Sequence, residues 1–160
     1  MAIKAGDPMP QGVFKTMTPD GPKDLSTDDL FKGKKVVLFS VPGAFTPTCD
    51  ARHLPSFIGH AGDLQAKGID TIACMAVNDV FVMNAWGKSS GAAGNVLMLA
   101  DGNGDYAKAL GLTMDGSRFG MGLRGQRFAL VVDDGVARSV FIEAPGEFKV
   151  SSAEHVLGNL

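Results

Sequence analysis

The sequence predicts an α/β fold in which helices flank a mixed β-sheet and an N-terminal extension precedes it. Short apolar, β-branched runs alternate with segments of helical periodicity, and this alternation is followed by a hairpin pattern and a final helix. The chain has 160 residues, of which 45% are hydrophobic and 20% charged. That length suits one core and is short for two, so we expect a single domain over residues 1–160.

The first third of the chain predicts a hairpin, a strand and a helix. Residues 3–33 are rich in proline and glycine, which predicts a short hairpin over the edge of the core. Residues 36–41 form a short, β-branched, uncharged run typical of a buried strand. Residues 49–67 carry apolar side chains close to a helical period. We expect Thr48 to cap this helix and Gly68 to end it.

The rest of the chain continues the alternation. The predicted elements are a strand over 70–77, a helix from a cap at Asp79 through Trp86, a strand over 96–100, a helix over 106–110, strands over 127–132 and 136–142 turned by Asp133-Asp134-Gly135, and a helix over 152–160. Five glycines between Gly111 and Gly125 predict a long mobile loop. This order of elements fits a thioredoxin-like fold.

Charge and composition disfavour several classes of partner. A net charge of −2 gives no electrostatic reason to expect nucleic acid or an anionic membrane as a partner. No apolar run approaches the roughly 18 residues that a membrane span needs. The first eight residues resemble neither a secretory leader nor a transit peptide, so we expect a cytoplasmic location. Two cysteines do not make a disulfide scaffold, which favours reduced thiols in a reducing compartment.

Cys49 is the residue with the strongest chemical signal. It follows a predicted strand and a turn containing Pro42, Gly43 and Pro47, and it falls in the first turn of the predicted helix. Free backbone N–H groups and the positive end of the helix dipole favour the thiolate there, and the thiolate is the reactive form of cysteine. A buried inert cysteine is common in proteins, but a proline-rich strand-to-helix turn is an unusual place for one.

Pro42, Thr46 and Cys49 form the pattern P-x-x-x-T-x-x-C, which resembles the signature of peroxiredoxins. The wider string Val41-Pro-Gly-Ala-Phe-Thr-Pro-Thr-Cys49, followed by His53-Leu54-Pro55, is similar to the type II branch, peroxiredoxin subfamily five. The likeness continues through Ala73-Cys-Met-Ala-Val-Asn-Asp79, Ala85-Trp-Gly87 and Gln126-Arg-Phe-Ala-Leu-Val-Val-Asp-Asp-Gly135. It therefore covers essentially the whole chain.

The resemblance implies a thiol peroxidase that reduces hydrogen peroxide and alkyl hydroperoxides in antioxidant defence. The Cys49 thiolate would attack the peroxide and become a sulfenic acid, and glutathione with glutaredoxin, or thioredoxin, would regenerate it. No cofactor or metal is implied. The resemblance also implies a homodimer formed through the face that bears the active-site loop.

Three further residues complete the expected site. Thr46 can offer its hydroxyl to the sulfur or to a peroxide oxygen. The alternative is that it only caps the local backbone. Pro42 would shield the thiolate and fix the loop. The site also needs a fixed positive charge, and Arg127 matches the family's active-site arginine at the start of a strand. The other candidates for this charge are Arg52, Arg118, Arg124 and Arg138. Of these, we expect Arg124 and Arg138 to be surface residues at strand edges.

Two residues leave alternatives open. His53 lies four residues beyond Cys49 on one helical face, which would allow a cysteine hydrolase, but support for the active-site loop is the favoured role. Cys74 lies in a predicted central strand, which favours a buried inert thiol. The alternative is a resolving cysteine that captures the Cys49 sulfenic acid. The resemblance implies a place for a resolving cysteine near the C-terminus, which some type II relatives carry, but residues 150–153 contain none, so we favour a cycle with one redox-active cysteine.

Several other sequence patterns give only weak support for a function. Gly102-Asn-Gly-Asp-Tyr-Ala107 formally fits a dinucleotide-binding pattern but lacks the acidic residue about 20 positions on. His60 and His155 have no partner at metal-ligand spacing. Trp86 and the phenylalanines are most simply core residues, with Phe45 the exception at a dimer contact or pocket. A peroxide-sensing relay that passes oxidation to a partner protein would share the Cys49 chemistry and stays open.

Overall fold

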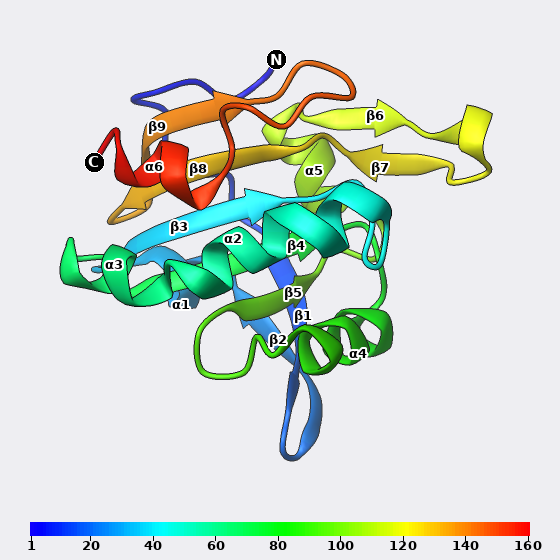
Figure 1. Ribbon diagram of the computed structural model, residues 1–160, viewed down its shortest axis with the longest axis horizontal. Coiled ribbons are helices and arrows are strands. Elements are labelled where there is room, and N and C mark those ends of the chain that lie inside the picture. The colour runs from blue at the N-terminus through cyan, green and yellow to red at the C-terminus, as the bar shows by residue number, and fades with distance from the viewer.

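The computed structural model describes residues 1–160 and is built around one seven-stranded mixed sheet (Figure 1). Its strand order is β2-β1-β5-β4-β3-β8-β9, in which β3, β4 and β5 run parallel and the remaining pairs are antiparallel. These strands are β1 (Val13–Thr18), β2 (Gly21–Ser26), β3 (Lys35–Ser40), β4 (Thr71–Ala76), β5 (Leu97–Ala100), β8 (Phe128–Asp133) and β9 (Val136–Ile142). The predicted mixed sheet is confirmed.

Helices cover both faces of this sheet. One face carries α2 (Leu54–Gly59), α3 (Ala61–Ala66), α4 (Val80–Ser90) and α6 (Ala153–Leu157), and the other carries α1 (Thr27–Phe31) and α5 (Asp105–Leu110). The central strands are therefore buried on both sides, with Val37 and Phe39 in the first core and Val36 and Leu38 in the second. Continuous apolar runs are what such strands require. None of the helices has the length and apolar character needed to cross a bilayer.

The predicted helix over 49–67 is real but differs in its start, its winding and its continuity. Pro47 and Thr48 are already helical, so Thr48 does not cap the helix, and its side chain makes no capping hydrogen bond. Residues Cys49–His53 form a π-helical turn, and the helix breaks at His60, where φ is −106° and ψ is 12°. Proline is well suited to the first helical position because its missing N–H has no partner there anyway.

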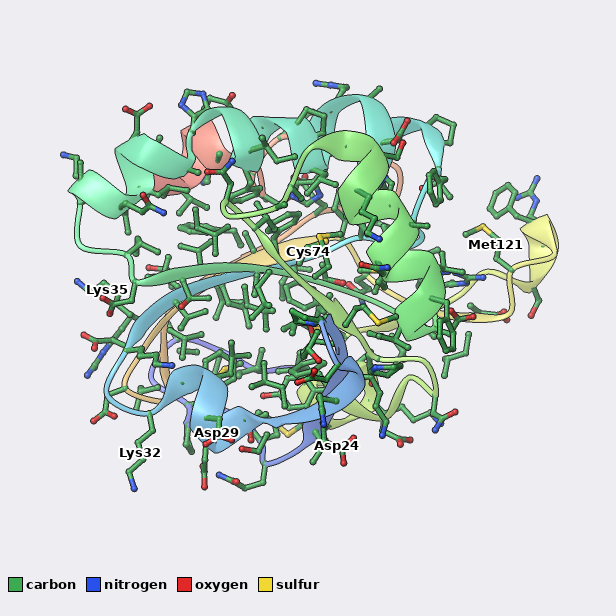
Figure 2. The ribbon with its side chains drawn as sticks, turned by 90° about the horizontal axis from the view of Figure 1, so that it is seen from below. Asp24, Asp29, Lys32, Lys35, Cys74 and Met121 are labelled. Carbon is green, nitrogen blue, oxygen red and sulfur yellow. The ribbon has the colours of Figure 1, made fainter.

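The predicted mobile loop over 111–125 is wrong. Residues Thr113–Asp115 (β6) and Leu123–Gly125 (β7) pair as an antiparallel ribbon, with a 3₁₀ turn at Ser117–Phe119 between them. The glycines serve the reversal, since Gly120 and Gly122 have φ of 71° and 65°, a region that other residues rarely adopt. Figure 2 shows this ribbon extending from the body of the molecule, with Met121 near its tip.

Both predicted hairpins are confirmed. β1 and β2 pair through a tight turn, and β1 also joins the main sheet beside β5. β8 and β9 are joined by Asp134 and Gly135, whose φ values of 48° and 79° are those of a type I′ turn. The predicted cap at Asp79 is also present, because Asp79 accepts from the Val82 N–H. Ser152 caps the last helix in the same way by accepting from the His155 N–H.

Candidate active site

Three strand ends bring the predicted site residues together. β3 ends at Ser40 and leads directly into the loop that contains Pro42. Ser40 pairs with Phe128 across the antiparallel β3–β8 ladder, so Arg127 lies beside the beginning of that loop. The carboxyl end of the parallel strand β4 lies at the same edge of the sheet and leads into Asn78. Cys49 and Arg127, which are 78 positions apart in the sequence, are therefore neighbours because the register of the sheet brings them together.

The π-helical turn places Cys49 and His53 on one side of the helix. Its wider ring is closed by the Leu54 N–H, which donates to the Cys49 carbonyl five residues back. Both side chains have no more than a trace of exposed surface, each at 0%. Single π turns occur frequently at functional sites. Cys49 also lies within the first helical turn, where backbone N–H groups have no intrahelical acceptor.

Arg127 bridges these two side chains with its guanidinium. Its Nη2 donates to the Cys49 Sγ at 3.0 Å, and its Nη1 donates to the His53 Nδ1 at 2.9 Å. Because arginine stays protonated, it is a permanent donor at both positions. A charged donor aimed at sulfur stabilises the thiolate. The predicted pairing of Arg127 with Cys49 is thus present in the geometry.

The loop between β3 and the helix is held from two sides. The Thr46 hydroxyl donates to the Gly43 carbonyl at 2.7 Å, which uses its only proton and leaves its lone pairs free to accept. The Ala44 N–H donates to the Asn78 side-chain oxygen at 2.9 Å. Phe45, in the same loop, has a φ of 65°, which is unusual for a bulky residue. Pro42 is half-buried at the start of this loop.

His53 is held neutral and is fully engaged. Burial first, and the neighbouring Arg127 charge second, lower the pKa of His53 to about 3. Its Nε2 lies 2.9 Å from the Ser151 carbonyl, to which it donates, while its Nδ1 accepts from Arg127. No nitrogen is left to take a proton from Cys49. This arrangement disfavours the cysteine hydrolase and gives His53 the supporting role that was preferred.

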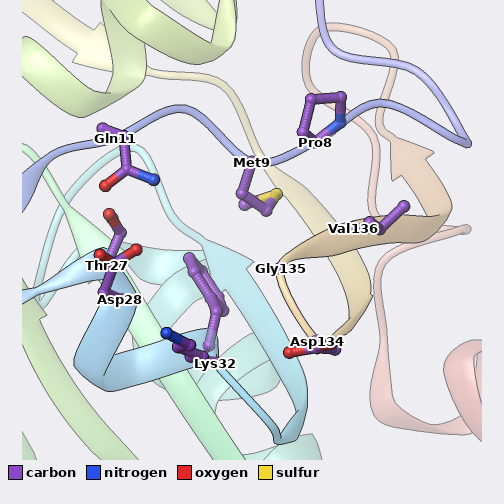
Figure 3. A pocket seen from close by; sticks show the side chains of 10 residues that line it. Pro8, Met9, Gln11, Thr27, Asp28, Lys32, Asp134, Gly135 and Val136 are labelled. Carbon is purple, nitrogen blue, oxygen red and sulfur yellow. The ribbon is translucent and has the colours of Figure 1, made fainter.

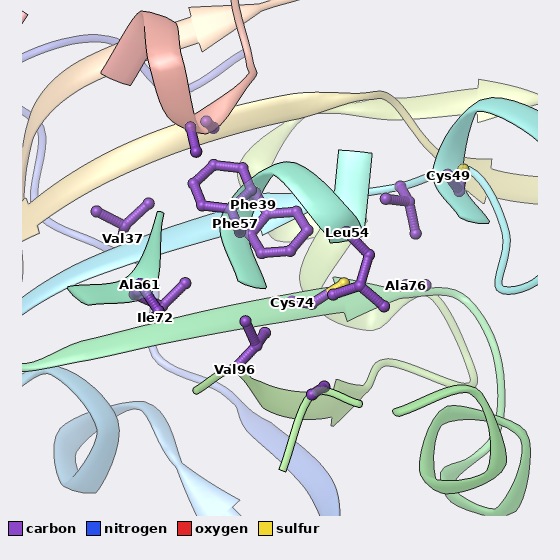
Figure 4. Packing of buried hydrophobic residues seen from close by; sticks show 14 of the residues in the cluster. Val37, Phe39, Cys49, Leu54, Phe57, Ala61, Ile72, Cys74, Ala76 and Val96 are labelled. Carbon is purple, nitrogen blue, oxygen red and sulfur yellow. The ribbon is translucent and has the colours of Figure 1, made fainter. Parts of the chain in front are cut away.

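Cys74 lies inside the sheet, as the sequence predicts. It occupies the middle of β4, opposite Phe39 of β3, and has no exposed surface (Figures 2 and 4). Burial first, and the nearby Cys49 charge second, raise the pKa of the Cys74 thiol well above its usual value. Both cysteines are free thiols. The geometry therefore favours the interpretation that Cys74 is a buried, inert thiol.

Two residues of the site were misjudged or missed. Arg124, taken as a surface residue, is half-buried and donates to the Met121 and Val77 carbonyls at 2.9 and 3.1 Å. A Cβ at Gly43 would lie 3.3 Å from its Nη1, so Arg124 packs the β6–β7 ribbon against the active-site loop. Asn78 was not singled out, although an asparagine just after a parallel strand is a useful signal for a loop anchor.

Aromatic residues divide differently from the prediction. Trp86 is in the core, where its Nε1 donates to Asp50 at 2.9 Å. Phe45, Phe81 and Phe119 are instead largely exposed, at 49%, 65% and 72%. The expectation that phenylalanines other than Phe45 are core residues is therefore wrong for two of them.

In the glycine-rich pattern at 102–107, the backbone N–H groups that could bind a phosphate already donate to a side chain of the protein. The buried Asp101 carboxylate accepts from the N–H groups of Tyr106 and Ala107 at the start of α5. A phosphate would meet that negative charge where it needs donors. A cavity of about 260 Å³ between the N-terminal segment, α1 and the β8–β9 turn contains none of the predicted site residues (Figure 3).

Comparisons with known proteins agree with this geometry. The Redoxin family model matches residues 4–157. Peroxiredoxin-2E-2, chloroplastic, of Oryza sativa subsp. japonica is 49% identical over 160 residues, which cover 97% of this chain and 71% of that protein. The crystal structure of reduced Prx3 in complex with H2O2 from Vibrio vulnificus superposes with a TM-score of 0.95 at 49% identity, covering 98% of each chain.

A third comparison supports the same branch of the family that the motif resembles. The crystal structure of peroxiredoxin 5 from Alvinella pompejana has a TM-score of 0.86 and 37% identity, and the match covers 97% of this chain and 96% of that one. The predicted thioredoxin-like fold with a mixed central sheet is confirmed. The chain therefore belongs to the peroxiredoxin family, in its type II or subfamily five branch, and is an oxidoreductase that acts on peroxide.

Proposed function

We propose that Cys49 is the peroxide-reducing cysteine and that Arg127, Thr46 and Pro42 form the rest of its site. The observation that carries this proposal is the 3.0 Å contact between the Arg127 Nη2 and the Cys49 Sγ. It pairs a thiol at a helix start with a permanent cation, and both features favour the nucleophilic form of sulfur. Cys74 has neither feature.

The chemistry follows from these contacts. The Cys49 thiolate attacks one peroxide oxygen, the O–O bond breaks, and the sulfur becomes S–OH while the other oxygen leaves as alkoxide or hydroxide and takes up a proton. Arg127 and the Cys49 N–H donate to the oxygens as negative charge develops on them. Thr46 donates to Gly43, so its oxygen accepts the peroxide O–H and orients the substrate. Pro42 shields the sulfur from water.

We assign hydrogen peroxide and small alkyl hydroperoxides as substrates. The Cys49 side chain has no exposed surface, which favours small molecules that can enter a closed loop. The Prx3 structure from Vibrio vulnificus, 49% identical to this chain, was solved with H2O2, which supports the same substrate here.

The reductant comes from outside the chain in this proposal. Cys74 is buried in the sheet with a raised pKa, so it is poorly placed to resolve the sulfenic acid. An external thiol condenses with Cys49 S–OH to release water and form a mixed disulfide, and a second thiol then restores Cys49. Glutathione with glutaredoxin, or thioredoxin, supplies these thiols. Such a cycle suits a reducing compartment such as the cytoplasm, although two relatives are named as chloroplastic.

Peroxide consumption tests the proposal. Reduced wild-type protein should consume hydrogen peroxide with at least one of the two reducing systems, Cys49→Ser should be inactive, and Cys74→Ser should turn over normally. The faster system identifies the reductant. A Cys74→Ser variant that stops after one turnover would make Cys74 the resolving cysteine. Wild-type protein that is oxidised once but not recycled by either system would favour the relay to a partner protein.

We also propose that a second copy of this chain covers the exposed aromatic residues around the active-site loop. Phe45 lies in that loop, 6.3 Å from Trp86 of α4 between ring centroids, Phe81 lies in the first turn of α4, and Phe119 and Leu123 lie on the β6–β7 ribbon and its turn. Exposed apolar groups of this size commonly mark interfaces. Analytical ultracentrifugation should show a homodimer that Phe45→Glu and Phe81→Glu weaken, whereas a monomeric wild type would contradict it.

A further inference from the structure

A closed path of hydrogen bonds begins and ends on Arg127. Its backbone carbonyl accepts from the Glu143 N–H at 3.0 Å, which continues the β8–β9 ladder by one pair. Its guanidinium donates to His53. The atoms between these two points belong to Glu143, Ser151 and His53. The backbone and the guanidinium of Arg127 therefore depend on one network.

The Glu143 side chain organises residues 149–151. It is 6% exposed, and its carboxylate accepts from the Lys149, Val150 and Ser151 N–H groups at 2.8 to 2.9 Å and from the Ser151 hydroxyl at 2.7 Å. Burial alone would raise the pKa of Glu143, but these donors together hold it below its usual value. A buried carboxylate with this many donors fixes the backbone that supplies them.

The fixed backbone then determines the tautomer of His53. The Ser151 carbonyl can only accept, so the His53 Nε2, at 2.9 Å, carries the proton. The Nδ1 must be bare, because the Arg127 guanidinium can only donate to it. Phe148, in the same segment, packs on the imidazole with ring centroids 5.0 Å apart and lies 5.9 Å from the Arg127 Cζ. One short segment thus orients and covers both groups.

We propose that Glu143 is a positioning residue for Arg127, acting through the Ser151 carbonyl and the His53 ring on the guanidinium that contacts Cys49. The proposal rests on the proposed role of Arg127 at Cys49. Without the Glu143 carboxylate, residues 149–151 lose their common acceptor, the Ser151 carbonyl shifts, and the imidazole no longer holds Nη1. The guanidinium then no longer points its Nη2 at the Cys49 sulfur, and Cys49 reacts more slowly with peroxide.

The chain offers a matched control for Glu143. Glu147 lies in the same connection between β9 and α6 and is exposed, and its carboxylate pairs with the Lys149 Nζ at 3.3 Å. Glu143→Gln and Glu147→Gln remove the same charge, but only the first disturbs the network. The reaction with hydrogen peroxide is followed by stopped-flow fluorescence of Trp86, the single tryptophan, which bonds to Asp50 next to Cys49.

We expect Glu143→Gln to slow the peroxide reaction about tenfold and Glu143→Ala up to about 100-fold, since misplacing a catalytic group by about 1 Å has effects of this size. Glu147→Gln should react like wild type. The decisive measurement is the same substitution in an Arg127→Gln background, where Glu143→Gln should slow the reaction no further, because residues acting as one unit are not additive.

Two results would overturn the proposal. One is a folded Glu143→Gln variant that reacts as fast as Glu147→Gln. The other is an equal slowing by Glu143→Gln with and without Arg127, which would show a general structural effect. Loss of peroxide reactivity in the wild type itself would instead contradict the proposed function, so the two failures are distinguishable.

A measurement on the wild type covers the case in which Glu143→Gln does not fold. Nitrogen-15 chemical shifts of the imidazoles should show His53 neutral with its proton on Nε2 at pH 7. A proton on Nδ1, or a charged ring, would contradict the path, because neither form can accept from Arg127. His60 and His155 serve as internal references, since both are partly exposed.

Discussion

Cys49 and Cys74 are equally buried yet chemically opposite. Both have 0% exposure and belong to the same apolar cluster, as Figure 4 shows. Cys49 lies in the first turns of a helix and receives a hydrogen bond from Arg127. Cys74 lies in the middle of a sheet strand, where burial raises the pKa of its thiol. In the proposed function, burial therefore does not decide which cysteine reacts; the nearby charge and the free backbone donors do.

The comparison also explains why the two cysteines need different surroundings. A strand interior offers sulfur only apolar contacts, since the ladder uses every N–H of a central strand. A helix start offers unpaired N–H groups and an outward dipole. The register of β3 with β8 adds the arginine. The proposed peroxidase chemistry of this chain therefore depends on where it changes from strand to helix.

Removing the arginine should make Cys49 resemble Cys74. Arg127→Gln should lower the rate with hydrogen peroxide about 10²–10³-fold, the usual effect of losing one preorganised donor. Arg127→Lys should fall between, because it keeps the charge but cannot bridge sulfur and imidazole. The rate is measured by stopped flow, with Arg138→Gln on the exposed side of β9 as control. An Arg127→Gln variant within twofold of wild type would contradict this account.

Removing the Thr46 hydroxyl tests the second difference between the two cysteines, a loop that holds substrate. Thr46→Val loses the Gly43 contact and the acceptor for the peroxide O–H, so we expect a loss of about 10–100-fold in kcat/KM. Thr46→Ser keeps the hydroxyl and should stay within a few-fold of wild type. Equal losses in both variants would mean that the methyl group, not the hydroxyl, matters.

His53 should make the protein less stable in acid. Its pKa is about 3 in the fold and about 6.5 in the unfolded chain, so the unfolded state binds the extra proton between these values. Stability from this group is complete above pH 6.5 and falls by about 1 kcal/mol per pH unit below it. Denaturant unfolding of wild type and His53→Gln at pH 4, 5 and 7 measures this difference. Parallel curves would contradict a neutral buried His53.

Cys74→Ser should reduce stability while leaving peroxidase activity intact. The smaller, more polar hydroxyl enters an apolar site, at a cost of about 1–3 kcal/mol. Cys74→Ala should cost less than the serine variant if polarity dominates, and more if the lost volume dominates. Urea denaturation compares the two. A loss of activity without a loss of stability would indicate a chemical role for Cys74.

The residues of the proposed site were easier to predict from the sequence than the network that supports them. The spacing of Pro42, Thr46 and Cys49 is local, and a resemblance located Arg127. The path through Glu143 and Ser151 depends on side chains about 100 residues from Cys49, joined by strand register and a loop, and no local pattern encodes that contact. The two-stranded ribbon at 113–125 was hidden because its glycines look like a loop whether or not the flanking residues pair.

The helix was also only partly predictable. Its apolar period indicated a helix near residues 49–67, but not the start at Pro47, the π turn or the break at His60. The π turn accompanies two side chains that share one guanidinium. Sequence periodicity cannot distinguish four residues per hydrogen-bonded turn from five over such a short stretch.

The most direct test of the central difference is to find which sulfur hydrogen peroxide oxidises. Reduced protein is treated with one equivalent of peroxide in the presence of dimedone, which traps sulfenic acids, and the peptides are analysed by mass spectrometry. The account predicts an adduct on Cys49 and none on Cys74, and no adduct on Cys49 at the same reaction time in Arg127→Gln. A dimedone adduct on Cys74, or a Cys49–Cys74 disulfide that forms before trapping, would contradict it.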